Sequence, residues 1–436
     1  MIVPTPRLWL LLALGVPVAA IGYQQGVWLM PAIYDGVLFV AAATTVWLGP
    51  RARDLRVVRK FDQVLSVRVS NRIELSIENA GTDPLLFTLR DEPPPSIERR
   101  PSEFRISLAP GAVVQRQYHV NPQVRGSDYF RGTYVRLACP LGLVVRQERL
   151  PTDQPFRVYP NVLALREFDL LNQKGRLREL GIRRTRMRGL GTEFESLREW
   201  AEGDDFRKID WMATARRDRL IVRQYETERN QSVLIGIDVG RHMLGEIDGV
   251  TKLDHALDAC LLLAHAAAAA GDNVGLFIYA DHVIRYIPPR KGRNQVGMII
   301  EALHDQVAQP VETDSIAAFS YLAARWKRRS LVVNFTDSGD ADRATAISSA
   351  LAPLVRRHLV LLARVSDPKL KEVLDTRLQT VDDMYRKAAA LLLDEDRRQA
   401  TSVLTLHGLH SLESEPQDLA ANLVSFYFQA KESALI

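Results

Sequence analysis

Two apolar stretches near the N-terminus constrain this chain more than any other feature, because they have the composition of membrane-spanning helices. Residues 8–23 carry no charged side chain, and residues 28–48 carry one ionisable group, Asp35. A helix needs about 20 apolar residues to cross a bilayer core of ~30 Å, so the second stretch is long enough and the first is short. Only residues 24–27 separate them. We therefore expect a two-helix transmembrane hairpin within residues 1–50.

A second interpretation of the first stretch stays open. Arg7 before it and the small residues Val18, Ala19 and Ala20 within it also resemble a secretory signal peptide, which is cleaved. Either way, basic residues directly after the second stretch mark its cytoplasmic end. We therefore expect a protein of the inner membrane with the bulk of its chain in the cytoplasm. These basic residues are Arg51, Arg53, Arg56, Arg59 and Lys60.

Residues 62–160 are predicted to form an all-β sandwich of immunoglobulin-like type. The run Arg72–Glu78 alternates apolar and polar side chains, and the turn signal Asn79–Gly81 follows it. Short strands at roughly ten-residue spacing are typical of antiparallel sandwiches. The chain has no catalytic cluster here, so a scaffold or docking role is expected. Further strand-like runs are 85–89, 104–108, 113–120, 132–139 and 143–148.

Residues 161–230 are predicted to be a basic connector followed by a charged motif. Between Lys174 and Arg188, seven basic residues stand against one acid, Glu179. A solvated or salt-bridged connector is the first interpretation, and contact with anionic lipids of the inner leaflet is the second. Nucleic-acid binding is the third interpretation and is not expected, because the segment lacks interleaved aromatic residues and a recognised fold. The basic residues are Lys174, Arg176, Arg178, Arg183, Arg184, Arg186 and Arg188.

The motif in residues 189–216 combines dense charge with spaced apolar side chains. Those apolar residues, such as Phe194, Trp200, Phe206 and Trp211, are expected to pack and so to bring the charges within reach of one another. We interpret the charges as a polar clasp between two domains. A catalytic acid pair is the alternative, but ion networks also form without catalysis.

This segment resembles the central motif of the family called domain of unknown function 58. The family shares a glycine–threonine–glutamate–phenylalanine step and a glycine–aspartate–aspartate–x–arginine–x–isoleucine–aspartate–tryptophan step, which match 191–194 and 203–211 here. The resemblance implies a C-terminal domain like von Willebrand factor A and an association with MoxR-type AAA+ ATPases. It implies no reaction. The signature positions are Gly191, Thr192, Glu193, Phe194, Arg198, Gly203, Asp204, Asp205, Arg207, Asp210, Trp211 and Arg216.

Residues 231–436 independently predict an α/β domain of Rossmann-like type. The apolar run Ser232–Asp238 is typical of a strand buried on both faces. Thr251 and Asp254 form a capping-box pattern, and apolar positions at helical spacing continue to Gly271. Alternating strands and helices predict a mostly parallel sheet covered on both faces. Further predictions are a hairpin of 273–280 with 283–288, helices 293–303 and 316–327, and strands 331–336 and 359–364.

Ligands of parallel sheets lie beyond the carboxyl ends of the strands, where Asp238 and Asp337 are expected. The resemblance to von Willebrand factor A domains implies a metal-ion-dependent adhesion site there, with Asp238, Gly240, His242, Thr313 and Asp337 at its positions. Position 240 has no side-chain oxygen, and position 242 offers an imidazole where Mg²⁺ prefers oxygen. No cofactor is certain. The alternatives are Mg²⁺ or Mn²⁺, Zn²⁺ if the histidine is a ligand, or an aspartate pair bonded to loop amides without metal.

An enzymatic function is not expected, because no catalytic motif stands in a convincing context. The run Gly236–Gly240 has the spacing of a hydrolase elbow, with Asp238 as nucleophile and His407 or His410 as base. This hydrolase is the alternative. The two cysteines, Cys139 and Cys260, lie too far apart in sequence for a disulfide framework or a four-thiolate metal site.

Together these features predict a membrane-anchored adaptor that binds proteins on the cytoplasmic face. The expected partners are a MoxR-type AAA+ ATPase, from the family resemblance, and other membrane-associated proteins. The C-terminal domain, residues 231–436, is expected to bind them through loops at the carboxyl edge of its sheet. The turn after Ile237 must then lie next to the turn after Thr336.

Overall fold

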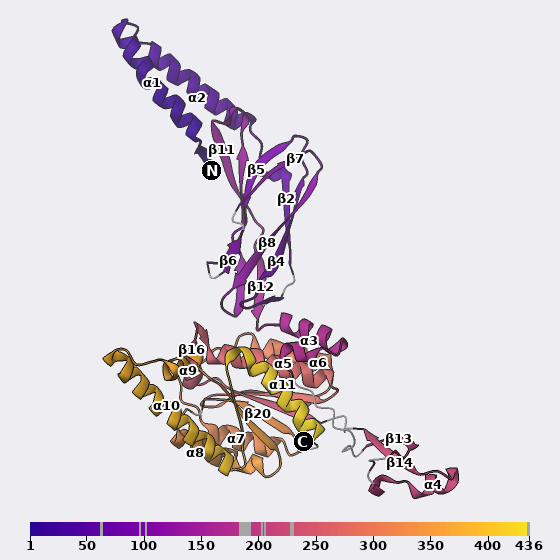
Figure 1. Cartoon of the computed structure of the whole chain (residues 1–436). Coiled ribbons are helices and arrows are strands. Elements are labelled where there is room, and N and C mark those ends of the chain that lie inside the picture. The colour runs from indigo at the N-terminus through magenta and orange to yellow at the C-terminus, as the bar shows by residue number, and fades with distance from the viewer. Residues whose placement is uncertain are drawn as a thin grey trace. The chain divides into compact units, whose positions relative to one another are not determined.

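The chain divides into two compact units, Met1–Tyr159 and Pro160–Ile436 (Figure 1). The computed structural model describes residues 1–61, 64–95, 97–100, 103–182, 193–201, 204, 206–226, 231–337 and 339–433. The first unit holds the two apolar helices and the β-rich region, and the second holds the mixed α/β region.

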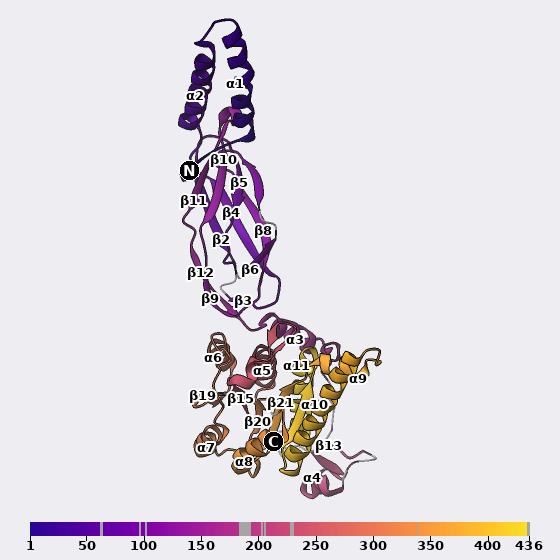
Figure 2. The same cartoon turned by 90° about the vertical axis from the view of Figure 1, so that its left-hand side faces the viewer.

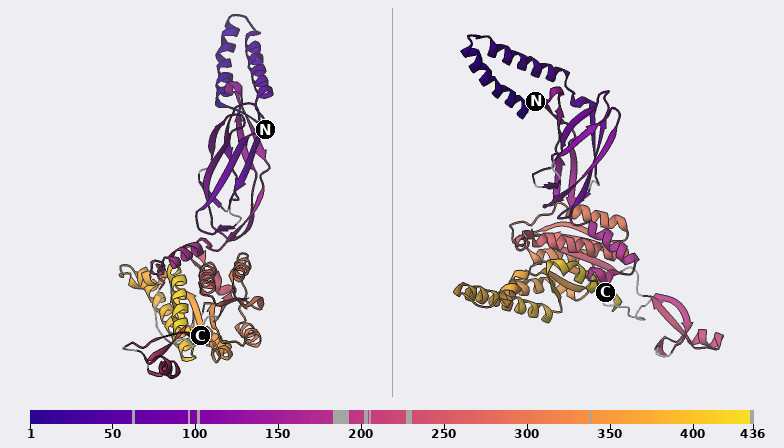
Figure 3. Two further views of the ribbon diagram at one scale, coloured as in Figure 1. Left: turned by 90° about the vertical axis from the view of Figure 1, so that its right-hand side faces the viewer. Right: turned by 45° about the horizontal axis from the view of Figure 1, so that its top comes forward.

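The two apolar stretches form antiparallel helices that lie side by side (Figure 3). Helix α1 spans Pro6–Gln24 and helix α2 spans Met30–Leu48. Both are long and apolar enough to cross a membrane. The hydroxyl of Tyr34 donates to the carbonyl of Leu11 at 2.7 Å, which links the two helices.

The N-terminal end of α1 and the C-terminal end of α2 are both attached to the β-rich region. Strand β1 (Ile2–Pro4), which precedes α1, pairs antiparallel with β11 (Val144–Leu150). At the other end, the guanidinium of Arg146 donates to the carbonyls of Val46, Gly49 and Pro50 at 2.7, 3.3 and 3.1 Å. Those carbonyls lie at the C-terminal end of α2, where a helix has unsatisfied acceptors. The first few residues therefore belong to a sheet and not to the hairpin.

The β-rich region is a sandwich-like arrangement of three sheets (Figure 2). Their strand orders are β1-β11-β10-β5-β7, β2-β4-β8-β6 and β3-β12-β9. All the predicted strand runs are strands here, and in β4 (Asn71–Asn79) every second side chain is buried, as the alternation predicted. The remaining bounds are β2 Leu55–Lys60, β3 Val64–Ser66, β5 Leu85–Arg90, β6 Ile97–Arg100, β7 Phe104–Leu108, β8 Val113–Pro122, β9 Gly126–Phe130, β10 Thr133–Ala138 and β12 Gln154–Tyr159.

The sandwich begins earlier than the expected boundary at residue 62. Strand β2 lies before it and pairs antiparallel with β4 along its whole length. Leu55 and Arg59 of β2 point into the protein and are buried, whereas Arg56 and Lys60 are exposed. The sequence did not indicate this strand, because its buried residue Arg59 is one of the basic residues that were assigned to the membrane flank.

The second unit opens with a connector and a small hairpin. Helix α3 (Leu163–Gln173) and a 3-10 turn (Leu177–Leu180) lead to strands β13 (Glu193–Glu199) and β14 (Ile221–Glu226), which pair antiparallel. A 3-10 turn (Phe206–Lys208) and helix α4 (Trp211–Arg217) lie between these strands.

The α/β region is built on a six-stranded sheet of order β19-β18-β15-β20-β21-β22, in which only the edge strand β19 runs antiparallel. The predicted hairpin is β18 and β19, and the predicted strand Ser232–Asp238 is β15. Thr251 caps α5, and Gly271 follows its end with φ +83°. The strands are β15 Ser232–Asp238, β18 Asn273–Tyr279, β19 Val283–Arg290, β20 Leu331–Phe335, β21 Leu359–Val365 and β22 His410–Ser414.

Helices cover both faces of this sheet (Figure 1). Residues of α3, α5, α6 and α11 pack on one face, and residues of α7, α8 and α10 pack on the other. The mixed, mainly parallel sheet predicted from the sequence is therefore confirmed. The bounds are α5 Lys252–Ala269, α6 Arg293–Leu303, α7 Ser315–Arg325, α8 Ala341–Val355, α9 Pro368–Asp375, α10 Val381–Leu406 and α11 Pro416–Glu432.

Candidate functional site

The carboxyl ends of β15 and β20 lie side by side in the centre of the sheet. The two strands pair in parallel, with Ile237 opposite Phe335. The turns after Ile237 and Thr336 are therefore neighbours, as predicted. The chain continues from β15 to β18 on one side and from β20 to β21 on the other. This is the switch point of the sheet, where ligands of open α/β sheets usually bind.

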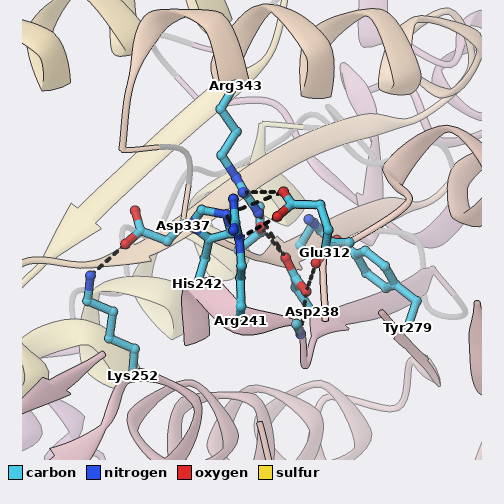
Figure 4. A network of polar contacts seen from close by, with 12 residues as sticks. Asp238, Arg241, His242, Lys252, Tyr279, Glu312, Asp337 and Arg343 are labelled. Carbon is cyan, nitrogen blue, oxygen red and sulfur yellow. Dashed lines mark hydrogen bonds and ion pairs between the residues drawn. The ribbon is translucent and has the colours of Figure 1, made fainter. Parts of the chain in front are cut away.

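Asp238 is the buried centre of this edge (Figure 4). One carboxylate oxygen accepts from the backbone N–H of Gly240 at 2.8 Å and from the hydroxyl of Thr313 at 2.7 Å. The other accepts from the hydroxyl of Thr336 at 2.7 Å. The guanidinium of Arg343 lies 3.7 Å from that second oxygen. The loops after β15 and β20 and the loop between α6 and α7 thus meet on one carboxylate.

Tyr279 lies beneath this carboxylate at the end of β18. Burial, and secondly the negative charge of Asp238, raise the pKa of Tyr279 well above its ordinary value. Its hydroxyl donates to the side-chain oxygen of Asn334 at 3.0 Å. Tyr279 is therefore a neutral hydrogen-bond donor and supplies no charge to the site.

Asp337 faces away from Asp238 and binds a lysine. The ammonium of Lys252 lies 2.5 Å from its carboxylate, and both side chains are mostly buried. Lys252 is the first residue of α5, and Thr251 caps that helix through the N–H of Asp254. The second predicted acid of the site is thus already neutralised by a cation of the chain itself.

Positions 240 and 242 do not supply metal ligands. A Cβ at Gly240 would lie 2.1 Å from the Thr313 hydroxyl oxygen, so a serine there would force a shift of Thr313 or of the loop. The imidazole Nε2 of His242 lies 3.4 Å from the carboxylate of Glu312, which also pairs with Arg241 and Arg343. Within the described parts of the chain, no group of three His, Cys, Asp or Glu residues could hold a metal ion. Of the five predicted positions, Asp238, Gly240 and Thr313 meet, and the donor set does not fit a divalent metal.

Four charged residues of this edge were missed by the sequence analysis: Arg241, Lys252, Glu312 and Arg343 (Figure 4). For two of them, the sequence position could have indicated a role in the site. Lys252 and Arg343 lie in the first turns of α5 and α8, where the helix dipole disfavours cations. A cation at such a position indicates an acidic partner nearby.

The two histidines proposed as the base of the hydrolase alternative do not lie near Asp238. His410 opens β22, at the amino end of a strand that runs parallel to β21, β20 and β15, so it lies at the edge opposite Asp238. His407 follows α10, and its ring contacts the carbonyl of Val403 at 2.8 Å. Asp238 itself is 0% exposed. A nucleophile and a base therefore do not meet here.

The signature segment forms the small β13–β14 hairpin. Arg198 holds Asp204 through two bonds of 2.7 and 2.5 Å, and Asp210 caps α4 through the N–H groups of Met212 and Ala213. Glu193 and Phe194 open β13, and Arg207 and Arg216 are exposed. Signature positions Gly191, Thr192, Gly203 and Asp205 lie outside the described residues, as do Arg183, Arg184, Arg186 and Arg188 of the connector.

The expectation that the apolar residues of this segment all pack is wrong. Ile209 is buried and the ring of Phe206 contacts the ring of Trp200, with centroids 5.6 Å apart, but Trp211 and Phe206 remain 67% and 66% exposed. A two-stranded hairpin with one short helix has too little surface to cover two large aromatic side chains. A polar clasp between domains stays a prediction, because the ion pair Arg198–Asp204 joins residues of the same segment.

The two cysteines are buried and free. Burial raises the pKa of the Cys260 thiol far above its ordinary value, and burial also raises the pKa of Cys139. Neither is a reactive thiolate in the folded chain.

Comparisons with known proteins find similarity to a family and to proteins whose own function is described as unknown. Residues 196–401 match the model of a family described as protein of unknown function DUF58. An uncharacterized protein of Mycobacterium bovis is 26% identical over 272 residues, which cover 57% of this chain and 82% of that protein. An uncharacterized protein of Mycobacterium tuberculosis matches with the same identity and coverage.

Two solved structures are also similar. An aerotolerance-related membrane protein from Bacteroides fragilis is 14% identical, with a TM-score of 0.30, and the match covers 46% of this chain and 99% of that one. The conserved hypothetical protein BatB from Bacteroides thetaiotaomicron is 13% identical, with a TM-score of 0.28, and the match covers 47% of this chain and 100% of that one.

Proposed function

The chain belongs to the DUF58 family, and from this premise we propose that it is a membrane-anchored adaptor of the inner membrane. Its α/β region, of von Willebrand factor A type, binds a partner protein through the carboxyl edge of the sheet. Its β-rich region is an immunoglobulin-like scaffold. The expected partner is a MoxR-type AAA+ ATPase, which the family resemblance implies.

One observation carries this proposal: the switch point of the sheet bears a rim of exposed charge over a buried, fully bonded centre. Asp238 is buried with three hydrogen bonds, whereas the side chains of Arg241 and Glu312 above it are 59% and 57% exposed. A rim of this kind can form ion pairs with a partner while the centre holds the loops in place. An enzyme would need the opposite arrangement, with a reactive group open to substrate.

The membrane anchor is supported by the way the helix pair meets the sandwich. Both α1 and α2 are long and apolar enough to span a membrane. Strand β1 pairs with β11 before α1 begins, and Arg146 binds the end of α2. Cleavage after α1 would remove β1 and leave the edge of β11 open, so we propose that the first segment is retained. The basic residues after α2 favour the cytoplasmic side for the rest of the chain.

A tethered adaptor raises the concentration of its partner near the membrane. Anchoring converts later binding steps into local ones, which increases the apparent affinity without new contacts. Anionic-lipid contact through Lys174, Arg176 and Arg178 would act in the same direction. Lipid contact is kept as an alternative function of the connector and not as its main one, because Glu179 already pairs with Arg176 and so neutralises one of the three cations.

The test uses the full chain in lipid nanodiscs and a purified MoxR-type ATPase, with binding measured by biolayer interferometry. We expect Arg241→Glu and Glu312→Lys each to weaken binding at least tenfold, because like charges then face each other across the interface. Both side chains are exposed, so the fold should persist. The matched control is Lys327→Glu, an exposed charge just before β20 at the opposite edge of the sheet. Equal binding by all four proteins would remove the carboxyl edge from the proposal.

A hydrolase with Asp238 as nucleophile makes a different prediction. It requires turnover of a small ester or halide that Asp238→Asn abolishes while partner binding survives. Asp238 is 0% exposed, and both its oxygens accept hydrogen bonds from threonine hydroxyls. The adaptor is therefore the function that the geometry supports better.

A further inference from the structure

We infer that the carboxyl edge of the sheet works without a divalent metal, because Lys252 and Arg343 supply the positive charge that a metal ion provides in adhesion-type sites. This inference rests on the proposed function in one respect: it takes the carboxyl edge of the sheet as the place where the partner binds. It specifies how a partner is recognised there: by ion pairs with side chains, not by a metal ion shared between two proteins.

The first argument is that the ligand oxygens are already engaged. Asp238 accepts from Gly240, Thr313 and Thr336 at 2.7–2.8 Å. The Thr313 hydroxyl donates to one oxygen of Asp238, and the guanidinium of Arg343 lies 3.7 Å from the other oxygen. A metal ion bound to Asp238 would share this carboxylate with the guanidinium of Arg343, and two positive centres on one carboxylate repel each other in a poorly solvated site.

The second argument is the position of the two cations in the chain. Lys252 opens α5 and Arg343 lies in the first turn of α8. The positive end of a helix dipole disfavours both positions, so each needs an acid close by. Lys252 lies 2.5 Å from Asp337, and Arg343 contacts both Asp238 and Glu312 (Figure 4). The acids and cations of this edge are therefore matched to one another.

The third argument is the lost serine position. A Cβ at Gly240 would lie 2.1 Å from the Thr313 oxygen and 3.1 Å from Asp238. The loop has closed around a glycine, and the hydroxyl of Thr313 fills the space that a ligating serine would need. Restoring one ligand by mutation would therefore displace another.

The consequence concerns conditions of binding. Partner capture should survive a chelator, and it should fall with rising salt, because exposed ion pairs are screened within about 10 Å at 0.1 M ionic strength. If the two proteins shared a metal ion, a chelator would instead abolish partner capture.

The decisive measurement is isothermal titration calorimetry of the full chain in detergent after dialysis against EDTA, with MgCl₂, MnCl₂ and ZnCl₂ as titrants. We expect no saturable heat up to millimolar metal. Saturable heat that remains in Asp238→Asn arises elsewhere in the chain and leaves the inference intact. Saturable heat that Asp238→Asn abolishes overturns it. No partner is present in this experiment, so its outcome is independent of whether the ATPase binds.

A double-mutant cycle tests the role of Lys252 separately. Lys252→Met and Asp337→Asn should each lower the Tm of the α/β region by about 2–4 °C, and the double variant should lose less than the sum. The matched control is Lys369→Met with Asp248→Asn, a lysine–aspartate pair whose side chains are 62% and 69% exposed. Its coupling should be close to zero. Equal coupling in the two cycles would mean that Lys252 does not hold Asp337 as inferred.

Discussion

The sandwich and the carboxyl edge of the α/β sheet each bury an aspartate, and the two are neutralised in different ways. In the sandwich, Asp91 accepts from Arg59, Tyr118 and Thr133, and the side chains of Asp91 and Arg59 are both 1% exposed. At the sheet edge, Asp238 accepts only from neutral donors, and its cation, Arg343, stays 3.7 Å away and 13% exposed.

The difference separates a structural pair from the edge that we propose binds a partner. The charge of Asp91 is cancelled by a partner that no other protein can reach, so the pair only joins β2 to its neighbours. The charge of Asp238 is cancelled by an arginine that also contacts Glu312, whose side chain is 57% exposed. A partner that binds Glu312 thereby alters the surroundings of the buried carboxylate. The exposure of the countercharge, not the burial of the acid, distinguishes Asp91 from Asp238.

The largest expected effect is in the sandwich. Arg59→Met leaves Asp91 buried without its cation, and we expect the free energy of unfolding of the sandwich to fall by about 3–5 kcal/mol. Hydrogen exchange of strands β2 and β4 measures this locally, because the sandwich strands contain no tryptophan. The control is Arg149→Met, whose pair with Asp153 is half exposed and should be worth at most about 1 kcal/mol. Similar losses in both variants would mean that burial of the countercharge does not matter.

The sheet edge should lose less when its acid is removed. Asp238→Ala leaves the N–H of Gly240 and two threonine hydroxyls without their acceptor, and we expect a loss of about 2–3 kcal/mol. The threonine hydroxyls can rotate, and Arg343 can turn toward Glu312, which limits the loss. Trp326, the only tryptophan after residue 211, reports unfolding of the α/β region by fluorescence. A loss above that of Arg59→Met would reverse the comparison.

A smaller effect is expected at the tightest contact of the edge. Gly240→Ser places a Cβ 2.1 Å from the Thr313 oxygen, and we expect about 1–2 kcal/mol of destabilisation from the forced shift. The control is Gly297→Ala in α6, where a Cβ meets nothing within 4 Å and the helix should gain about 0.5–1 kcal/mol. If Gly240→Ser is as stable as the unmodified chain, the loop has room for a serine ligand. That result would contradict the argument that the loop around Gly240 excludes a metal ligand.

The elements of the α/β region could be predicted because each carries a local pattern. The apolar run Ser232–Asp238 and the helix 293–303 have the predicted bounds exactly as β15 and α6, and parallel strands necessarily gather their carboxyl ends. The cations of the site could not be predicted in this way. Lys252 lies 85 residues from Asp337 in sequence, and only the folded sheet decides which of many lysines faces a given acid.

Strands β1 and β2 show the same limit in the sandwich. Three residues before a long apolar helix carry too short a pattern to indicate a strand, and β1 exists only because β11 offers an edge. Strand β2 was hidden because its buried Arg59 is indistinguishable, in sequence, from the basic residues that flank a membrane segment. Its partner Asp91 is 32 residues away. Pairings over such distances depend on the topology, which no local pattern specifies.

The smallest expected effect concerns the opposite edge of the same sheet, where the α/β region buries an imidazole as well as the ion pair of Asp272 with Lys431. Burial, and secondly the positive charge of Arg357, lower the pKa of His358, just before β21, below its ordinary value of about 6.5. Between the folded and the ordinary pKa the unfolded chain binds more protons, so the free energy of unfolding rises with pH. This stability is fully present above about pH 6.5 and is lost as the pH falls through that window. We expect His358→Gln to flatten the dependence, measured as the urea midpoint of Trp326 fluorescence between pH 5 and 7.5. An unchanged slope would mean that the acid sensitivity of this region arises from titratable groups other than His358.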